Sequence, residues 1–512
     1  MDHKEVVIIG AGPAGLTAGY ELSKHHVPAT IVEADDTVGG LARTVNYKDY
    51  LFDIGGHRFF TRWDEVNRLW HEILGDAFVE RNRLSRIYYR NRFFSYPLKP
   101  FNALSGLGWC ESARILISYL RAQLKPFSPE DNLERWVSNR FGRRLYETFF
   151  KTYTEKVWGV PCAEIGSEWA AQRIKSLSLG TALQNAMFRT KTVQIKSLVE
   201  RFHYPERGPG QMWETLAQRL SGNGCRVLLG SPVVRICHDG RKLNHIVVQG
   251  SKGMERHLGT HFISSMPIRD LINALEPAPP EGIQRAANSL HYRDFLIVSL
   301  IVNRKHVMSD NWIYIHDPAV GVGRIQNFKN WSPAMVPDPA KTCLGMEYFV
   351  TKNDKHWMRT DQELIELAKN ELEYLGLARR EEVEDGTVVR MPKAYPVYDN
   401  GWAESLRKIR NYLEDRLPNL QLVGRNGMHK YNNQDHSMMT AIYAARNILG
   451  ASYDLWAVNT EPEYHEQKTE PELFRAGAPA RHVEGLRWQA PSYSPPTIRK
   501  GLHGLPAAGD AD

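Results

Sequence analysis

The sequence has few cysteines and no long hydrophobic run, and each shortage argues against a class of protein. The five cysteines among 512 residues are odd in number and form no Cys-x-x-Cys pair, which argues against a disulfide framework and a structural zinc site. The longest apolar runs, such as Val6–Ile9 and Leu296–Val302, fall far short of the roughly 18 residues that a membrane-spanning helix needs. A predicted strand begins directly after Asp2–Glu5, so we expect no signal peptide, no membrane span and a cytoplasmic location.

The chain also lacks a dense stripe of one charge sign. It contains 65 Lys and Arg against 58 Asp and Glu, and the resulting net charge of +7 is spread along the sequence. A phosphate-bearing small ligand accounts for this excess as well as a nucleic acid would, and the absence of a basic stripe argues against a nucleic-acid partner. Hydrophobic residues make up 42% and charged residues 24%, which is ordinary for a soluble globular protein.

A strand, a glycine turn, a helix and a second strand open the chain. The run Val6–Ile9 ends at Gly10-Ala11-Gly12-Pro13-Ala14-Gly15, a helix is predicted to about His25, and the strand Ala29–Val32 follows. Glycine lets backbone N–H groups approach a pyrophosphate, and the helix N-terminus adds positive potential. An acid after the second strand can accept hydrogen bonds from a ribose. The pattern predicts dinucleotide binding by Gly10, Gly12, Gly15 and Glu33; a glycine turn in an unrelated α/β protein is the alternative.

Two further glycine pairs lie close behind Glu33. Gly39 and Gly40 precede Arg43, which can reach a phosphate, and a second loop at this place favours FAD over NAD because FAD extends past the second strand. Taken alone, this segment could be an ordinary surface turn. Gly55 and Gly56 precede His57 within an aromatic segment, which suits a backbone laid against a flat ring; the alternative is a hairpin with a surface histidine.

A polar segment joins a late strand to a late helix. Gly424-Arg425-Asn426-Gly427 follows the apolar run 420–423, and a helix is predicted over about 434–449. The N-terminus of that helix would point at the flavin end of a bound dinucleotide, although a simple polar cap by Asn433 or Asp435 is compatible with the same pattern. The candidate cofactor contacts here are Arg425, Asn433, Gln434, Asp435 and Ser437.

The rest of the chain alternates between helical and strand patterns. Apolar residues at helical spacing begin at Val66 and continue to about 177, so 65–195 is predicted as a mostly helical insertion. Strand signals from 295 to 350 predict an antiparallel substrate sheet in 286–384. We expect an α/β fold whose Rossmann-like FAD domain is built from 1–64, 196–285 and 385–458. The Pro-rich remainder, 459–512, is predicted to be poorly ordered or draped on the surface.

Together these motifs resemble those of the FAD-dependent UDP-galactopyranose mutases, within the wider clan of amine oxidases and protoporphyrinogen oxidases. The segment Asn433–Ser437 is most similar to the eukaryotic-type branch, and Phe262–Pro267 matches the clan's strand that ends in Met-Pro. The resemblance covers about 1–450; it is strong over 5–60 and 420–450, and weak over 65–145 and in the tail.

The resemblance also implies roles for individual residues. It places His57 beside the isoalloxazine ring, Arg425 near the flavin, and Arg173 and Arg324 on the substrate diphosphate, which arginine forks can pair bidentately. Three tyrosines would contact the same diphosphate: Tyr314, Tyr395 and Tyr431. For each arginine alone, a surface salt bridge is the alternative.

One segment departs from the eukaryotic-type mutases. The family holds uracil near a Tyr-Pro-Phe-Gln segment, whereas this chain has Tyr96-Pro97-Leu98-Lys99. The sequence therefore leaves the base open between uracil and guanine, with Tyr96 and Lys99 as candidate contacts.

For activity, the resemblance implies a redox-neutral isomerisation of a nucleotide-diphosphate sugar. Reduced FAD attacks the anomeric carbon through N5 and displaces the diphosphate, and the sugar ring opens and recloses as the furanose. NAD(P)H would serve only to reduce the flavin. Two other readings stay open: a flavin oxidase or desaturase with an apolar tunnel, and a non-catalytic nucleotide-binding protein. The sequence also leaves open whether the chain forms a homo-oligomer.

Overall fold

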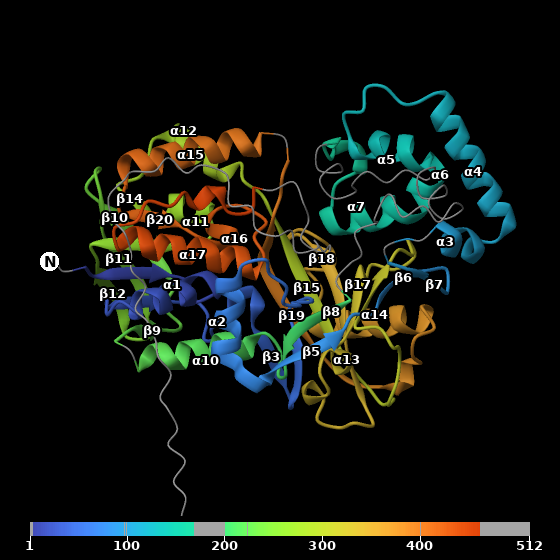
Figure 1. Cartoon of the computed structure of the whole chain (residues 1–512), viewed down its shortest axis with the longest axis horizontal. Coiled ribbons are helices and arrows are strands. Elements are labelled where there is room, and N and C mark those ends of the chain that lie inside the picture. The colour runs from blue at the N-terminus through green and yellow to red at the C-terminus, as the bar shows by residue number, and fades with distance from the viewer. Residues whose placement is uncertain are drawn as a thin grey trace, which may run out of the picture. The chain divides into compact units, whose positions relative to one another are not determined.

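A parallel five-stranded sheet starts at the N-terminus (Figure 1). Its order is β20 (Leu420–Leu422), β13 (His261–Ser264), β1 (Val6–Ile9), β2 (Ala29–Val32) and β9 (Arg226–Leu228), and every pair is parallel. All four residues of β1 and of β2 are buried, as expected of a parallel sheet covered on both faces.

The computed structural model describes residues 4–96, 98, 100–167, 200–222, 224–399 and 401–460. All of these belong to one unit, Met1–Lys468. Outside the described residues lie Arg173, Lys99, the last part of the helical pattern predicted up to about 177, and almost the whole predicted tail.

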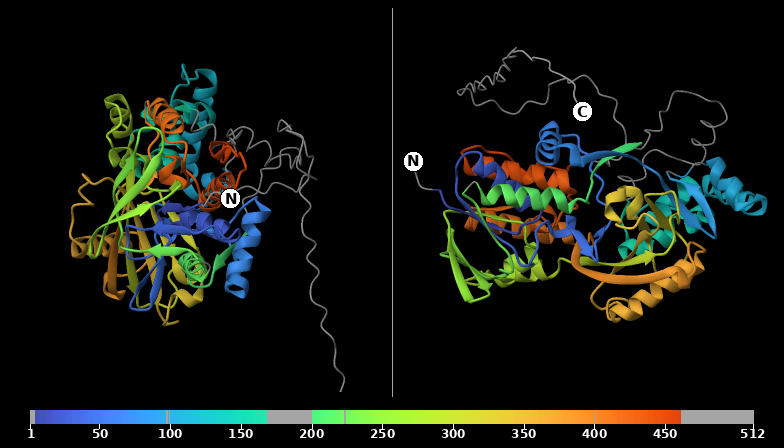
Figure 2. Two further views of the ribbon diagram at one scale, coloured as in Figure 1. Left: turned by 90° about the vertical axis from the view of Figure 1, so that its left-hand side faces the viewer. Right: turned by 90° about the horizontal axis from the view of Figure 1, so that it is seen from below.

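Three helices pack together beside this sheet. α1 (Pro13–Ser23) contacts both α17 (Gln434–Ile448) and α10 (Gly210–Ser221), and Figure 2 shows the three lying side by side. α1 is buried from Ala14 to Ser23 because it lies between the sheet and these neighbours. The N-termini of α1 and α17 both follow parallel strands, β1 and β20, so they emerge at the same edge of the sheet.

A seven-stranded sheet forms the second part of the fold. Its order is β19 (Val383–Pro396), β15 (Tyr292–Val302), β18 (Thr342–Val350), β17 (Arg324–Asn327), β16 (Trp312–Ile315), β6 (Ser85–Tyr89) and β7 (Arg92–Ser95). Only the β16–β6 pair is parallel among these strands. Alternate residues of β15 face opposite sides: Leu296 packs with helix α14 (Asp361–Tyr374), and Phe295 packs in the other cluster with Phe52.

The segment predicted as a helical insertion contains strands as well as helices. α2 (Asp64–Leu74) forms where the periodicity predicts it, and α3 (Pro100–Leu107), α4 (Trp109–Leu124), α5 (Leu133–Phe141), α6 (Arg143–Tyr146) and α7 (Thr152–Trp158) follow. Between them, β6 and β7 join the seven-stranded sheet, and β5 (Phe78–Asn82) pairs with β8 (Arg201–Pro205). Arg90 and Asn91 have φ of 48° and 59°, the left-handed pair that a two-residue hairpin turn requires. The expectation of a mostly helical segment is therefore wrong over 78–95.

Smaller elements complete the described chain. The hairpin β3 (Thr44–Tyr47) and β4 (Tyr50–Asp53) follows the glycine loops, and a four-stranded sheet contains β12 (Gly253–Leu258), β11 (Leu243–Gly250), β10 (Val233–His238) and β14 (Leu275–Glu276). The remaining helices are α11 (Ile268–Asn273), α12 (Glu281–Asn288), α13 (Phe328–Trp331), α15 (Trp402–Arg416) and α16 (Gly424–Gly427). No helix within the described ranges has both the length and the apolar character needed to cross a bilayer.

Candidate active site

A cavity of about 660 Å³ lies between the carboxyl edge of the parallel sheet and one face of the seven-stranded sheet. Each of the four sequence motifs contributes to its wall. The predicted residues that line it are Gly10, Gly12, Glu33, Gly40, Gly55, Gly56, His57, Tyr314, Arg324, Tyr395, Arg425, Tyr431, Asn433, Gln434, Asp435 and Ser437. Residues that are far apart in sequence thus share one site. Among the described residues, no cluster of three or more His, Cys, Asp or Glu side chains could hold a metal ion.

The glycines at the sheet end of the cavity leave a narrow cradle. A Cβ on Gly40 would lie 3.4 Å from the Cα of Gly12, so side chains at either position would fill the space between the two loops. Gly15 does not line the cavity; its Cβ would lie 1.8 Å from the carbonyl oxygen of Gly10, so glycine there lets α1 approach β1. These contacts suit a dinucleotide that needs exposed backbone N–H groups.

The carboxylate of Glu33 is fixed at the end of β2. It accepts hydrogen bonds from the backbone N–H groups of Ala11, at 2.6 Å, and Asp35, at 3.1 Å. It therefore faces the cavity from the position where a ribose is expected. Arg43 does not line the cavity and pairs with Asp35 instead, and Gly39, with φ of 98°, shapes the loop behind it.

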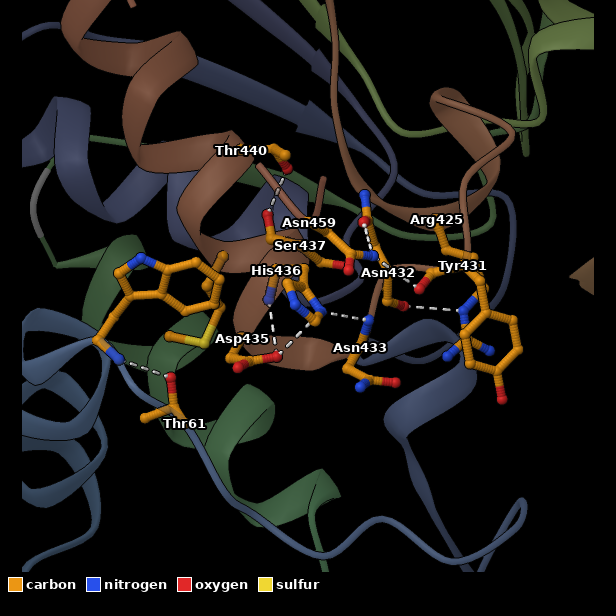
Figure 3. A network of polar contacts seen from close by, with 12 residues as sticks. Thr61, Arg425, Tyr431, Asn432, Asn433, Asp435, His436, Ser437, Thr440 and Asn459 are labelled. Atoms are coloured by element: carbon orange, nitrogen blue, oxygen red, sulfur yellow. Dashed lines mark hydrogen bonds and ion pairs between the residues drawn. The ribbon is translucent and has the colours of Figure 1, made fainter. Parts of the chain in front are cut away.

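The first residues of α17 also line the cavity, and Figure 3 shows their polar contacts. The backbone N–H of Asn433 donates to Nδ1 of His436 at 3.1 Å, and Asp435 accepts from the backbone N–H of His436 at 2.8 Å. Burial raises the pKa of Asp435 to about 6. The Oε1 atom of Gln434 is buried with no hydrogen-bond partner among the described residues. The N-termini of α1 and α17 thus both line one cavity, and this arrangement fits FAD.

His57 lies where the two sheets meet. Its Nδ1 is 3.2 Å from the carbonyl oxygen of Gly55. Burial lowers the pKa of His57 to about 3, and the charges of Arg425 and Arg324 act in the same direction. The imidazole is therefore neutral near neutral pH. Gly56 has no room for a side chain, because its Cβ would lie 2.9 Å from Nε2 of Gln326.

A buried carboxylate that the sequence analysis missed holds Arg324. Nε of Arg324 and Nε2 of Gln326 donate to Glu347 at 2.6 Å and 2.8 Å. Burial alone would lower the pKa of Arg324, but the charge of Glu347 and the neighbouring Tyr153, Tyr395 and Tyr314 together outweigh it and raise that pKa, so the guanidinium stays charged. Glu347 is the single charged residue in the mostly apolar strand β18. A buried acid is almost always paired, so its position in this strand is the sequence signal that could have revealed the ion pair.

The predicted tyrosines surround two arginines. Tyr395 and Tyr431 stack with ring centroids 5.7 Å apart, and the guanidinium of Arg425 lies 4.8 Å from the centroid of Tyr431. Arg425 donates to the carbonyl oxygens of Asn432 and Ala394, which fixes it in place. Tyr314 pairs in register with Arg324 across β16 and β17. Tyr96 does not line the cavity, but its ring lies 4.6 Å from that of Tyr314.

The cavity half bounded by the seven-stranded sheet is cationic. Besides the predicted arginines, it contains cations that the sequence analysis did not single out: Arg58, Arg83, Lys352 and Lys393. The acids in the described lining are Glu33 and Asp35 after β2, Asp435 in α17, and Asp270, which pairs with Lys393. This half of the cavity is suited to a ligand that carries more than one negative charge.

Comparison with known proteins identifies relatives with several activities. The chain matches the model of flavin-containing amine oxidoreductases over residues 13–449. It is similar to a probable UDP-galactopyranose mutase of Klebsiella pneumoniae, 27% identical over 186 residues that make up 32% of this chain and 44% of that protein. An L-amino-acid oxidase of Crotalus adamanteus is 44% identical over 83 residues, 16% of this chain and 15% of that protein. The chain thus matches less than half of the length of these curated relatives.

Solved structures with the same architecture cover nearly the whole chain. A crystal structure of reduced UDP-galactopyranose mutase superposes with a TM-score of 0.77 at 23% identity, over 90% of this chain and 98% of that one. A putative protoporphyrinogen oxidase from Exiguobacterium gives 0.66 at 18% identity, over 88% and 100%. At these identities the likeness shows the fold, and it confirms the predicted α/β class. Because the family match spans most of the sequence, the chain belongs to the flavin-containing amine oxidoreductases.

Proposed function

We propose that the protein is a flavin-dependent mutase that interconverts the pyranose and furanose forms of a UDP- or GDP-hexose. The observation that carries this proposal is the cationic half of the cavity, where Arg324 lies beside the tyrosines near His57. A nucleotide sugar brings a diphosphate, which matches charged guanidinium and hydroxyl donors.

The residues that line the cavity fit FAD, so a role in binding or catalysis can be assigned to each. Gly10, Gly12 and Gly40 would face the pyrophosphate, and Glu33 would bind the ribose. Reduced FAD, when bound, would supply the nucleophile for the anomeric carbon. His57 would contact the flavin ring as a neutral imidazole. NAD(P)H would act only as the reductant that primes the flavin.

The chain's own residues would hold the diphosphate while the sugar reacts. Glu347 fixes the guanidinium of Arg324, so this cation is oriented before the substrate arrives. Burial raises the pKa of Tyr395, so its hydroxyl keeps its proton and can donate to a phosphate oxygen. Holding the diphosphate close lets it rejoin the sugar. Arg173, Tyr96 and Lys99 remain predicted substrate contacts.

An oxidase of amines, carotenoids or porphyrinogens is the second candidate, because the family and the L-amino-acid oxidase relative favour it. The same cationic wall counts against a protonated amine as substrate, since like charges would meet in a partly desolvated site. Oxygen consumption distinguishes the two functions.

The test uses dithionite-reduced protein with UDP-galactose and GDP-mannose. A mutase yields the furanose isomer, detected by NMR, without consuming reductant in proportion to product. An Arg324→Lys variant keeps the positive charge but loses the planar, bidentate guanidinium group. This change should weaken nucleotide binding by about 1.5–3 kcal/mol. Arg235→Lys is the matched control, because Arg235 is exposed and pairs with Glu276 at the surface. Stoichiometric oxidation of reductant, or oxygen uptake with an amine, would reject the mutase.

A further inference from the structure

Helix α4, at the outer edge of the α3–α7 group, has two faces of different character. It packs against α3, α5 and α6, and Figure 1 shows α5 and α6 on its inner side. The side chains that it buries are Ser112, Ile115 and Ala122, which lie on one face of the helix. The fold therefore uses only this face of α4.

The large apolar side chains of the other face are exposed along the whole length of α4. Trp109, the first residue of the helix, is 93% exposed, and Leu124, the last, is 86% exposed. Between them, Leu116, Ile117 and Leu120 are 38%, 49% and 58% exposed. At about 3.6 residues per turn, these five positions fall on one side of the helix, and we refer to them as the α4 stripe. A contiguous exposed apolar surface of this kind is typical of a docking surface.

Three exposed cations follow one edge of the α4 stripe. Arg114 and Arg121 lie seven residues apart, which is about two helical turns. Lys125 continues this edge, because its backbone N–H still donates to the carbonyl oxygen of Arg121 at 2.9 Å. Arg114 lies 3.5 Å from a carboxylate oxygen of Glu111, whereas the side chains of Arg121 and Lys125 form no ion pair with any described residue. We refer to Arg114, Arg121 and Lys125 as the basic row.

The charges of α4 argue against a second copy of this chain as the partner of the stripe. The only acid of the helix, Glu111, accepts from Nε of Arg144 on α6, so it is held toward the packed face. In a two-fold symmetric, antiparallel pair of α4 helices, both basic rows would lie on the same side of the contact and repel each other. A parallel pair would separate the rows but would bring no acid of α4 against either of them.

An anionic bilayer, in contrast, matches both features of this face. Its headgroups carry the negative charge that the basic row requires, and the layer beneath them accepts apolar side chains, so a helix with this combination lies in the plane of the interface. Tryptophan, the most exposed residue type of the stripe, is favoured at that depth. The stripe is also exposed at both of its ends, which suits a flat partner that contacts the whole helix at once.

We propose that the α4 stripe and the basic row form a docking surface for an anionic lipid bilayer. The apolar side chains enter the interface, while the basic row stays at the level of the headgroups. This inference does not depend on the proposed function, because the surface is built from residues that do not line the cavity.

The test measures sedimentation of the whole chain with vesicles of phosphatidylcholine, alone or with about 30% phosphatidylglycerol. Binding to the anionic vesicles should be at least about tenfold tighter than to the neutral ones, because each Lys or Arg near such a surface contributes about fivefold, and added salt should weaken it. Combining Arg121→Gln with Lys125→Gln should reduce binding to the anionic vesicles at least about tenfold. Leu120→Ser and Leu124→Ser should each reduce it at least about fivefold, because less apolar surface enters the interface.

Matched controls alter similar side chains on other surfaces. Leu258→Ser changes a leucine of β12 that is 61% exposed, and Arg407→Gln with Lys408→Gln changes an exposed Arg and Lys of α15. Neither control should change vesicle binding.

Three results would overturn the proposal. The first is no sedimentation with anionic vesicles, and the second is equal binding of the α4 variants and the wild type. The third is a dimer, detected by sedimentation velocity, that dissociates in Leu120→Ser, because a second copy would then cover the stripe. Mutase activity on soluble nucleotide sugars should be the same in all of these variants, so the outcome leaves the proposed function to its own test.

Discussion

The guanidinium of Arg324 lies against the carboxylate of Glu347, with Nε and Nη2 each 2.6 Å from Oε2. Glu347 is fully buried, and it also accepts from Gln326, whose Oε1 in turn accepts from Nε1 of Trp331. The network fixes one cation at the cavity wall and keeps it from bending away toward solvent. An arginine without these contacts would lose side-chain conformational entropy when it binds a ligand.

Glu347→Gln should therefore weaken the fold and change its response to ligand. The amide keeps the shape but leaves a guanidinium without its counter-ion, which costs about 3 kcal/mol of unfolding free energy. Urea unfolding measures this loss, and a saturating nucleoside diphosphate should restore part of it by pairing with Arg324. Glu404→Gln, which breaks an exposed pair with Lys408, should cause no measurable change. Equal stability of Glu347→Gln and the wild type would show that the buried pair is not ionised.

Gly15→Ala should abolish flavin binding. The new Cβ would lie 1.8 Å from the carbonyl oxygen of Gly10, so α1 must move away from β1 and the cradle must open. Flavin absorbance per mole of purified protein measures the effect. Gly282→Ala is the control, because nothing lies within 4 Å of the added Cβ on α12 and alanine favours a helix. Normal flavin content in Gly15→Ala would contradict the close helix–strand contact.

Asp53→Asn should change how stability depends on pH. Asp53 is buried and accepts from the hydroxyl of Tyr204 at 2.6 Å. Burial raises its pKa from 3.8 to about 8, so the folded protein keeps a proton that the unfolded chain releases. Raising the pH through this window therefore favours unfolding, by about 1.4 kcal/mol per pH unit for this one group.

The difference between the two proteins isolates Asp53. His57, whose pKa is lowered to about 3, has the opposite effect on stability as pH rises toward its unfolded pKa, but it is present in both proteins and cancels. From about pH 4 to about pH 8, the unfolding free energy of the wild type should fall relative to that of the variant. Urea unfolding across this range checks the trend, and parallel profiles would show that Asp53 is ionised in the folded state.

Local patterns predicted most of the residues that line the cavity beside the parallel sheet, because each strand, turn and helix there is one short contiguous segment. β1, the glycine turn and α1 are contiguous, and the observed α1 ends at Ser23, near the predicted His25. The same holds for β20 and α17. The resemblance supplied Tyr314, Tyr395 and Tyr431, and the structure places all three at the cavity.

Long-range contacts explain what the sequence could not provide. β6 pairs in parallel with β16, more than two hundred residues later, and no local pattern records this pairing. Glu347 could be noticed as an acid in an apolar strand, but its partner Arg324 lies on a neighbouring strand that only the register identifies. Arg58 and Arg83 likewise reach the ring of Trp312 from separate segments of the chain, which no local pattern records.

Thr440→Val should loosen the turn at Arg425, whereas the same change at Thr17 should not. The hydroxyl of Thr440 accepts from the backbone N–H of Gly424 at 3.1 Å and donates to the carbonyl oxygen of Ser437 at 2.8 Å, the latter drawn in Figure 3. Valine has nearly the same shape but leaves the buried N–H of Gly424 unsatisfied, which costs about 1–3 kcal/mol.

Thr17 is equally buried, yet its Oγ1 has no hydrogen-bond partner among the described residues. Thr17→Val should therefore be neutral or stabilising. Thermal unfolding and flavin release rates measure both variants, and an equal effect of the two changes would show that the Thr440 hydroxyl does not hold the turn.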